Sequence, residues 1–225
     1  MSNITVSEKY TLCMLKEIKN FSNMELSIHL VTAMLIEMML EGNIEIIKNF
    51  KKSFIGCNMS VKLNAKVPKE EYNQIFYNYL REASKDEINM YEAITSVCYG
   101  RAGFSDKKYK EIVTKFKEKM ISDNLIFLSS KKGLFGKREI ININDEKFDI
   151  IVNEIRDKFI DKGNYNDEMI LLASLLNSTN FLKNIVYKYE KEDLKNRLNE
   201  IKDTDISKSV KVAREVIAII TSTML

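Results

Sequence analysis

Helix-breaking residues are scarce along this chain, and their scarcity is the strongest constraint on its fold. Seven glycines and a single proline occur among 225 residues. Loops and tight β-turns consume these residue types, so a chain this poor in them is predicted to be mostly helical. We therefore predict a mainly α protein, in which one compact helical domain spans residues 1–225 and carries one or two small β-hairpins.

Capping boxes mark several helix starts, because a hydroxyl and a carboxylate three residues later satisfy free backbone amides. Such boxes open at Thr5, Ser22 and Ser84. Strands are predicted at Ile44–Ile47 and Phe54–Leu63. The predicted helices run from Thr5 to about Lys19, over Met24–Glu41 with a stop at Gly42, from Pro68 to about Glu82, from Ser84 to near Gly100, and over Asp106–Asp123, Asp145–Asp161, Met169–Leu176, Phe181–Lys202 and Ile206–Leu225.

One predicted helix is apolar nearly all round, and another is strongly apolar. They are the helix over Met24–Glu41, between Leu30 and Leu40, and the helix at Met169–Leu176. A helix without a polar face is buried on every side. Both are therefore predicted to be central helices of the core.

The charge and the cysteine pattern exclude several classes of protein. A net charge of +3 at pH 7 does not demand a nucleic-acid partner. The three cysteines, Cys13, Cys57 and Cys98, are far apart and show neither zinc-site nor disulfide spacing. We expect them to be buried thiols of a protein in a reducing compartment.

The apolar runs are too short for a transmembrane helix. The longest, Leu30–Leu40 and Val216–Ile220, fall far short of the roughly 20 residues that a span requires. The first ten residues, MSNITVSEKY, lack the basic-then-apolar pattern of a secretion signal. We therefore expect a cytoplasmic protein whose association with membranes is peripheral.

The sequence shows no constellation of nucleophile, base and metal ligands. His29, the only histidine, is assigned a packing role because no nucleophile motif lies near it. Glu37 lies inside the apolar run MLIEMML, and we expect its carboxylate to bond a neighbouring amide or lysine, or to lie at the helix edge. We predict that the protein is not an enzyme and has no cofactor, metal or small-molecule substrate.

The most informative stretch for function is a predicted hairpin at Leu125–Asn144, LIFLSSKKGLFGKREIININ. Two short apolar strands are expected around a tip whose glycines allow a tight bend. The tip carries the apolar pair Leu134 and Phe135 among four cations, a combination that suits the surface of an anionic bilayer. We predict that Leu134 and Phe135 insert into the membrane. The cations expected to bind lipid headgroups are Lys131, Lys132, Lys137 and Arg138.

Four parts of the chain share their order and spacing with a known family. They are the apolar run Ala33–Ile44, the helix end Met120–Leu125 with the hairpin residues Lys132–Gly136, the helix Asp167–Leu182, and the final helix residues Ala213–Ile220. Together they resemble the Golgi phosphoproteins, phosphatidylinositol-4-phosphate-binding adaptors with many bacterial relatives. The richness in lysine, asparagine and isoleucine favours a bacterial-type member.

This resemblance implies a mostly helical domain with a membrane-inserting hairpin and a basic pocket for a phosphoinositide headgroup. It places Lys110 among the headgroup-binding residues, at one of two positions where the family has arginines three apart; Val113 occupies the other. Val31 aligns with a further family arginine, and the chain has no counterpart of the family's pocket tryptophan. Members of the family are peripheral membrane proteins without enzymatic activity, and some oligomerise. The partners implied by the resemblance are therefore anionic lipid and a second copy of the chain.

We therefore predict a peripheral membrane adaptor that binds anionic lipid headgroups, with a phosphoinositide as the headgroup implied by the resemblance. Two other hypotheses stay open. A helix over Asp106–Asp123 followed by a basic hairpin is also the order of a recognition helix and a wing in a nucleic-acid-binding protein. The acidic residues of that helix and the apolar tip count against nucleic acid. In the other hypothesis, the hairpin is the oligomer contact of a protein-interaction module.

Overall fold

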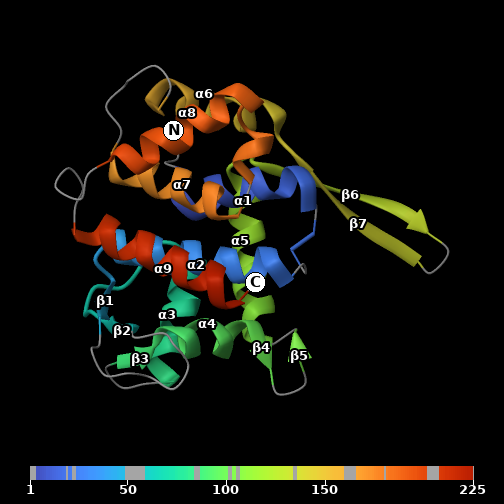
Figure 1. Cartoon of the computed structure of the whole chain (residues 1–225). Helices are drawn as coiled ribbons and strands as arrows, with labels where there is room; N and C mark the ends of the chain where they lie inside the picture. Colours follow the sequence, from blue (N-terminus) through green and yellow to red (C-terminus); the bar gives the residue numbers. More distant parts are fainter. Residues whose placement is uncertain are drawn as a thin grey trace. The chain divides into compact units, whose positions relative to one another are not determined.

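The computed structural model describes residues 4–18, 20–21, 24–48, 59–83, 87–100, 103–104, 107–133, 136–159, 166–179, 181–201 and 208–224. Within these ranges lie nine α-helices, one 3₁₀ helix and three small antiparallel sheets (Figure 1). The predicted mainly α class with small hairpins is confirmed. The chain divides into two compact units, and a single domain over residues 1–225 stays a prediction.

The first unit comprises Met1–Asn20 and Met120–Leu225 and is built around one central helix. Its elements are α1 (Val6–Ile18), β6 (Ile126–Gly133), β7 (Gly136–Ile143), α6 (Asp145–Phe159), α7 (Asp167–Ser178), the 3₁₀ helix η1 (Phe181–Asn184), α8 (Lys188–Glu200) and α9 (Lys208–Met224). Helix α7 packs against α1, α6, α8 and α9, so it has neighbours on several sides. The prediction that Met169–Leu176 forms a buried central helix is confirmed.

Side-chain caps hold the starts of two helices of the first unit. At α1, the amide of Thr5 donates to Glu8 Oε2 (2.8 Å) and the amide of Glu8 donates to Thr5 Oγ1 (3.3 Å). The capping box predicted at Thr5 is thereby confirmed. At α7, the amide of Met169 donates to Asn166 Oδ1 (2.9 Å). These bonds satisfy amides that the first turn of a helix leaves without a partner.

The second unit, Phe21–Lys119, combines a buried helix with a small sheet. Its elements are α2 (Met24–Leu40), β1 (Ile44–Lys48), β2 (Met59–Leu63), α3 (Glu71–Ala83), β3 (Glu87–Asn89), α4 (Met90–Cys98), β4 (Tyr99–Gly100), β5 (Gly103–Phe104) and α5 (Lys107–Ser122), whose residues from Met120 onward belong to the first unit. Strands β1, β2 and β3 form one antiparallel sheet in that order. Every side chain from Leu26 to Met39 is buried, which confirms the predicted central helix.

Gly42 ends α2, as the sequence predicted. Its φ of 75° lies in the left-handed region, which glycine adopts without strain. The amide of Gly42 donates to the carbonyl of Met39 (3.1 Å) and the amide of Asn43 to that of Met38 (2.8 Å). This pattern satisfies the last carbonyls of the helix and turns the chain toward β1.

The helix predicted from Ser84 is wrong at its start. Helix α4 begins at Met90, and the preceding residues Glu87–Asn89 form strand β3, which pairs with β2. Asn89 then caps the helix, because its Oδ1 accepts the amide of Tyr91 (2.9 Å). Pairing with a strand far away in the sequence therefore overrides the local capping signal. Of the strand predicted over Phe54–Leu63, the described part is β2, and residues 54–58 lie outside the described ranges.

The helix predicted over Phe181–Lys202 is interrupted. It consists of η1 and α8, which are separated by residues 185–187. Tyr187 has an extended backbone (φ −62°, ψ 156°), and its amide donates to Glu190 Oε2 (2.9 Å). A carboxylate in the first turn that holds the amide before the helix makes α8 a new helix rather than a continuation.

A buried carboxylate joins α2 to α3 in the second unit. Glu37 is 4% exposed, and its Oε1 accepts hydrogen bonds from Asn73 Nδ2 (2.7 Å) and from the Tyr72 hydroxyl (3.0 Å). The prediction that Glu37 bonds a neighbouring amide is confirmed. These two donors compensate for the removal of the carboxylate from water, so Glu37 serves the fold of this unit.

His29 is a buried residue of α2. Its side chain is 2% exposed, and burial lowers its pKa from 6.5 to about 4. The imidazole is therefore neutral at pH 7, since a charged ring would lose its hydration. This environment agrees with the packing role predicted for His29.

Candidate functional site, a basic two-stranded ribbon

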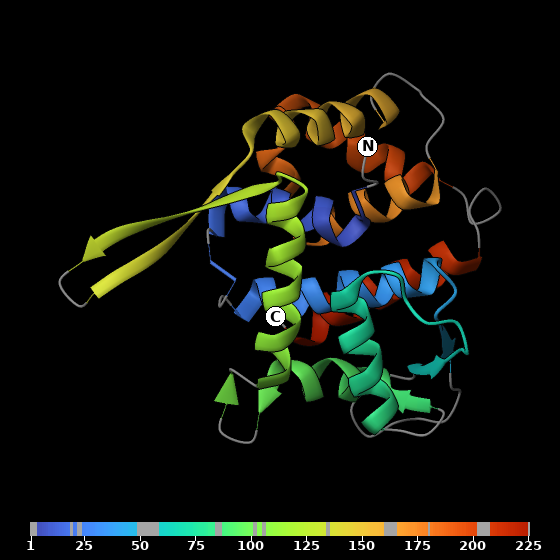
Figure 2. The same ribbon diagram turned by 180° about the vertical axis from the view of Figure 1, so that it is seen from behind.

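A long two-stranded ribbon, formed by β6 and β7, extends from the helices of the first unit. The strands pair antiparallel from Ile126 opposite Ile143 to Gly133 opposite Gly136. Eight residues at about 3.3 Å each span roughly 26 Å. Figures 1 and 2 show, from opposite sides, that most of this length lies clear of the helices of its unit.

The strands of the ribbon extend further than predicted, and this places its cations on strands rather than in the tip. The expected tip ran from Lys131 to Arg138, but β6 continues through Gly133 and β7 begins at Gly136. Leu134 and Phe135, the residues predicted to insert into a membrane, lie outside the described residues.

Cations occupy directly opposite positions on the two strands. Lys131 is paired with Arg138, and Lys132 with Lys137. Lys131 and Lys132 are exposed to solvent. Like charges at directly opposite positions repel, so each of these pairs destabilises an isolated ribbon. Negative charge brought against the ribbon would remove that repulsion.

Acidic residues of the ribbon offset little of this positive charge. The two strands carry four cations, two on β6 and two on β7, and one carboxylate, that of Glu139. Their net charge is therefore +3. Glu139 lies opposite Ser130 rather than opposite a cation. The ribbon is therefore the most strongly basic strand pair of the described chain.

The half of the ribbon nearer the helices exposes apolar side chains. Phe127 is 48% exposed and Leu128 is 41% exposed. Consecutive residues of a strand face opposite sides, so apolar surface is presented on both faces. A two-stranded ribbon gains little stability by itself, and these two side chains add little to it because they remain partly in water.

The base of the ribbon is anchored in the first unit. Ile126 is fully buried and Ile141 is 6% exposed. Lys16 of α1 forms an ion pair with Asp145, the first residue of α6, at a distance of 2.7 Å. The base is thus held by apolar packing, and the ion pair fixes the start of α6, which follows β7, against α1.

Lys110 does not belong to the ribbon. It is an exposed residue of α5 within the second unit, whereas the four other cations predicted to bind headgroups belong to the first unit. Val113, which the resemblance aligned with a family arginine, is 8% exposed. The structure therefore brings together four of the five predicted headgroup-binding cations and leaves Lys110 on a separate element.

Several lysines of α5 are engaged within the second unit. Lys115 lies 3.0 Å from Glu118 and 3.2 Å from Glu71, and its hydrogen bonds to these carboxylates raise its pKa. Contacts of this kind occupy charges that a recognition helix would present to phosphates. The other contacts are Lys119 with Glu70 (3.7 Å), Lys108 with the Tyr79 ring (4.9 Å) and Lys117 with the Phe21 ring (5.9 Å).

The thiols are inert where the structure describes them. Cys13 and Cys98 are free and buried, and burial raises the pKa of each to about 12. A protonated thiol is a poor nucleophile and a poor metal ligand. The prediction that the thiols are buried is confirmed for these two. Cys57 lies outside the described residues. Over the described ranges, no group of three or more His, Cys, Asp or Glu is placed to hold a metal ion.

No protein-family model and no curated protein matches this chain. The resemblance to the Golgi phosphoproteins therefore stays a prediction. Of the helices described, none combines the length and the apolar character needed to cross a bilayer.

Proposed function

We propose that the protein is a peripheral membrane adaptor that binds anionic lipid headgroups through the ribbon β6–β7. The observation that carries the proposal is the register that sets Lys131 opposite Arg138 and Lys132 opposite Lys137. The two pairs occupy positions on opposite faces of the ribbon, so a headgroup layer that the ribbon enters tip first relieves the repulsion within both pairs, whereas salt in water only screens it.

The expected strength of binding follows from the composition of the ribbon. Each cation held near an anionic surface contributes about 1 kcal/mol. Burial of Leu134 and Phe135 at the interface would add on the order of 2–5 kcal/mol before the costs of ordering. One copy should therefore bind weakly and reversibly, and a homo-oligomer should bind usefully through avidity.

A phosphoinositide is the headgroup that we favour, with phosphatidylinositol-4-phosphate as the first to test. The resemblance to the Golgi phosphoproteins implies it. In addition, a phosphate dianion needs several converging donors, and the register sets Lys131 opposite Arg138, a lysine and an arginine at positions on one face of the ribbon.

Nucleic acid offers an anionic surface as well, but two features favour lipid. Lysines of α5 that would line a recognition surface contact acidic and aromatic side chains of the second unit, as Lys115 does with Glu71 and Glu118. The apolar pair Leu134 and Phe135 gains nothing from a phosphate backbone, whereas it gains from a lipid interface.

Replacing the apolar pair by acids, Leu134→Asp with Phe135→Asp, should abolish co-sedimentation with phosphatidylcholine vesicles that contain phosphatidylserine. The change removes apolar burial and adds two charges that the anionic surface repels. A matched control is Val67→Asp with Ile150→Asp, which alters two exposed apolar side chains elsewhere (58% and 52% exposed) and should pellet like the wild type. If the tip variant also pellets like the wild type, the tip does not anchor the protein.

A further inference from the structure

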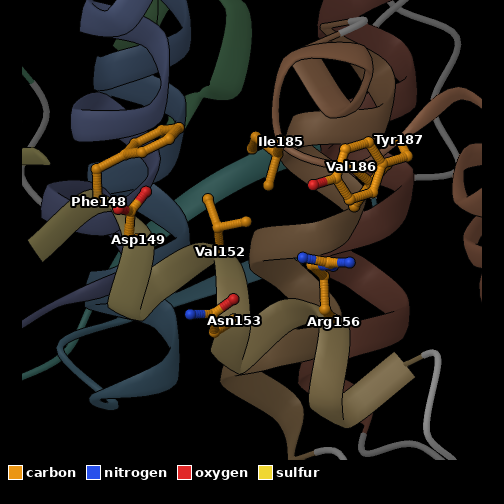
Figure 3. Close-up of a pocket in the computed structure, with 8 residues that line it drawn as sticks. All are labelled: Phe148, Asp149, Val152, Asn153, Arg156, Ile185, Val186 and Tyr187. Atoms are coloured by element: carbon orange, nitrogen blue, oxygen red, sulfur yellow. The ribbon is translucent and has the colours of Figure 1, made fainter. Parts of the chain in front are cut away.

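A hollow in the first unit lies between α6 and residues 185–187. Its volume is about 530 Å³, which is within the range of small-molecule sites. Figure 3 shows side chains of α6 on one side of it and those of residues 185–187 on the other. None of its lining residues belongs to the ribbon strands, so whatever it binds is a question separate from lipid binding.

The floor of the hollow is apolar. Phe148 and Val152 of α6, and Ile185 and Val186 of the facing segment, line it and are each between 5% and 8% exposed. Such side chains are fixed by the packing beneath them. They offer an apolar body a surface whose shape is formed before binding.

One wall of the hollow is a tyrosine held from two directions. Tyr187 is 59% exposed, and the guanidinium carbon of Arg156 lies 5.0 Å from the centroid of its ring. The amide of Tyr187 donates a hydrogen bond to Glu190 Oε2 (2.9 Å). Arg156 Nη2 donates to the other oxygen of the same carboxylate, Oε1 (2.6 Å). The aromatic surface is therefore presented in a defined orientation, which lowers the entropic cost of stacking a ligand on it.

The charges that line the hollow leave it with a negative balance. Asp149 and Arg156 are its charged lining residues. The charge of Arg156 is matched by Glu190, which is 5% exposed. Asp149 is exposed, and it forms no ion pair with any residue in the described parts of the chain.

A lysine also lies close to one edge of the hollow. The ammonium nitrogen of Lys16 is 4.8 Å from the ring centroid of Phe148. Its charge is matched by Asp145 at 2.7 Å. Among the described residues that line the hollow, Asp149 thus carries the one charge that no opposite charge neutralises. The hollow therefore attracts a cation rather than an anion.

We propose that this hollow is a binding site for an organic cation with an apolar body. The ammonium group would lie near Asp149, the body would rest on Phe148 and Val152, and an aromatic or methylene group would contact the exposed face of Tyr187. The amide of Asn153, which also lines the hollow, supplies a hydrogen-bonding group beside them.

A titration with phenethylammonium, followed by amide NMR of the full chain, tests the site. Saturable shifts are expected at residues 148–156 and 185–187. Phenethyl alcohol, the uncharged analogue, should bind about three- to five-fold more weakly, since it loses one exposed charge pair. Phenylacetate should bind more weakly still. Equal affinity for all three probes, or shifts scattered over the surface, would overturn the proposal.

Single substitutions locate the charge that selects the ligand. Asp149→Asn should weaken phenethylammonium binding by about three- to five-fold and leave the binding of phenethyl alcohol unchanged. Asp157→Asn changes an exposed carboxylate of the same helix outside the hollow, and should leave both affinities unchanged. If the two variants behave alike, Asp149 does not select the cation. The tip variant Leu134→Asp with Phe135→Asp should bind phenethylammonium like the wild type, so the outcome here is independent of membrane binding.

Discussion

Reversing two ribbon charges, Lys131→Glu with Lys132→Glu, should weaken binding to anionic vesicles by about two to three orders of magnitude. Each cation contributes about 1 kcal/mol near such a surface, and reversal of two costs about twice their joint contribution. The same change places glutamates opposite Arg138 and Lys137, so both repulsive pairs become attractive ones. The ribbon should thus be at least as stable as in the wild type while its binding is lost. Flotation isotherms and thermal unfolding measure the two effects separately.

A charge-matched variant separates the ribbon from the overall charge of the protein. Lys69→Glu with Arg81→Glu alters two exposed cations of the second unit and shifts the net charge by the same amount. It should retain most of the vesicle binding, because neither residue belongs to the ribbon. Equal losses in the two double variants would mean that binding depends on net charge, and the ribbon would lose its proposed role.

His29 should make the protein less stable in acid, by about 3 kcal/mol of unfolding free energy between pH 6.5 and about 4. Its pKa is lower in the folded state than in the unfolded state, so the unfolded chain binds a proton first as the pH falls. The stability is fully present above pH 6.5 and is lost as the pH falls toward about 4. Urea unfolding at a series of pH values gives the slope.

The variant His29→Gln isolates this contribution. Glutamine does not titrate, so the variant should show a flatter fall in unfolding free energy over the same pH range, whatever its stability at neutral pH. The carboxylates of the two proteins are identical and contribute equally to both curves. Parallel curves for wild type and variant would show that the buried histidine does not cause the acid sensitivity.

Amphipathic helices and wholly apolar helices could be predicted from the sequence, because their pattern of apolar residues lies within one short segment of the chain. The apolar runs at Leu30–Leu40 and Met169–Leu176 correspond to the buried parts of α2 and α7, and Gly42 ends α2 as expected. The helix expected from Ser84 failed because Glu87–Asn89 pairs with β2, some 25 residues earlier in the chain. Strand pairing over such separations leaves no mark in a local pattern.

The candidate site was predictable in its composition but not in its register. The cations at 131, 132, 137 and 138 were evident from the sequence. Which of them lie opposite each other depends on the register of β6 and β7, which the sequence does not show. The exposure of Phe127 and Leu128 was missed, although two consecutive apolar residues cannot share one face of a strand. The hollow beside α6 was not predictable, since the bond between Arg156 and Glu190 joins residues far apart in sequence.

Flotation of the wild-type protein with defined vesicles decides whether the ribbon meets lipid. The protein should float with phosphatidylcholine vesicles that contain phosphatidylserine or phosphatidylinositol-4-phosphate, should stay at the bottom with phosphatidylcholine alone, and should be released as the salt concentration rises. Equal flotation with neutral vesicles, or no flotation with any vesicle together with a salt-dependent shift of duplex DNA, would contradict the proposed function.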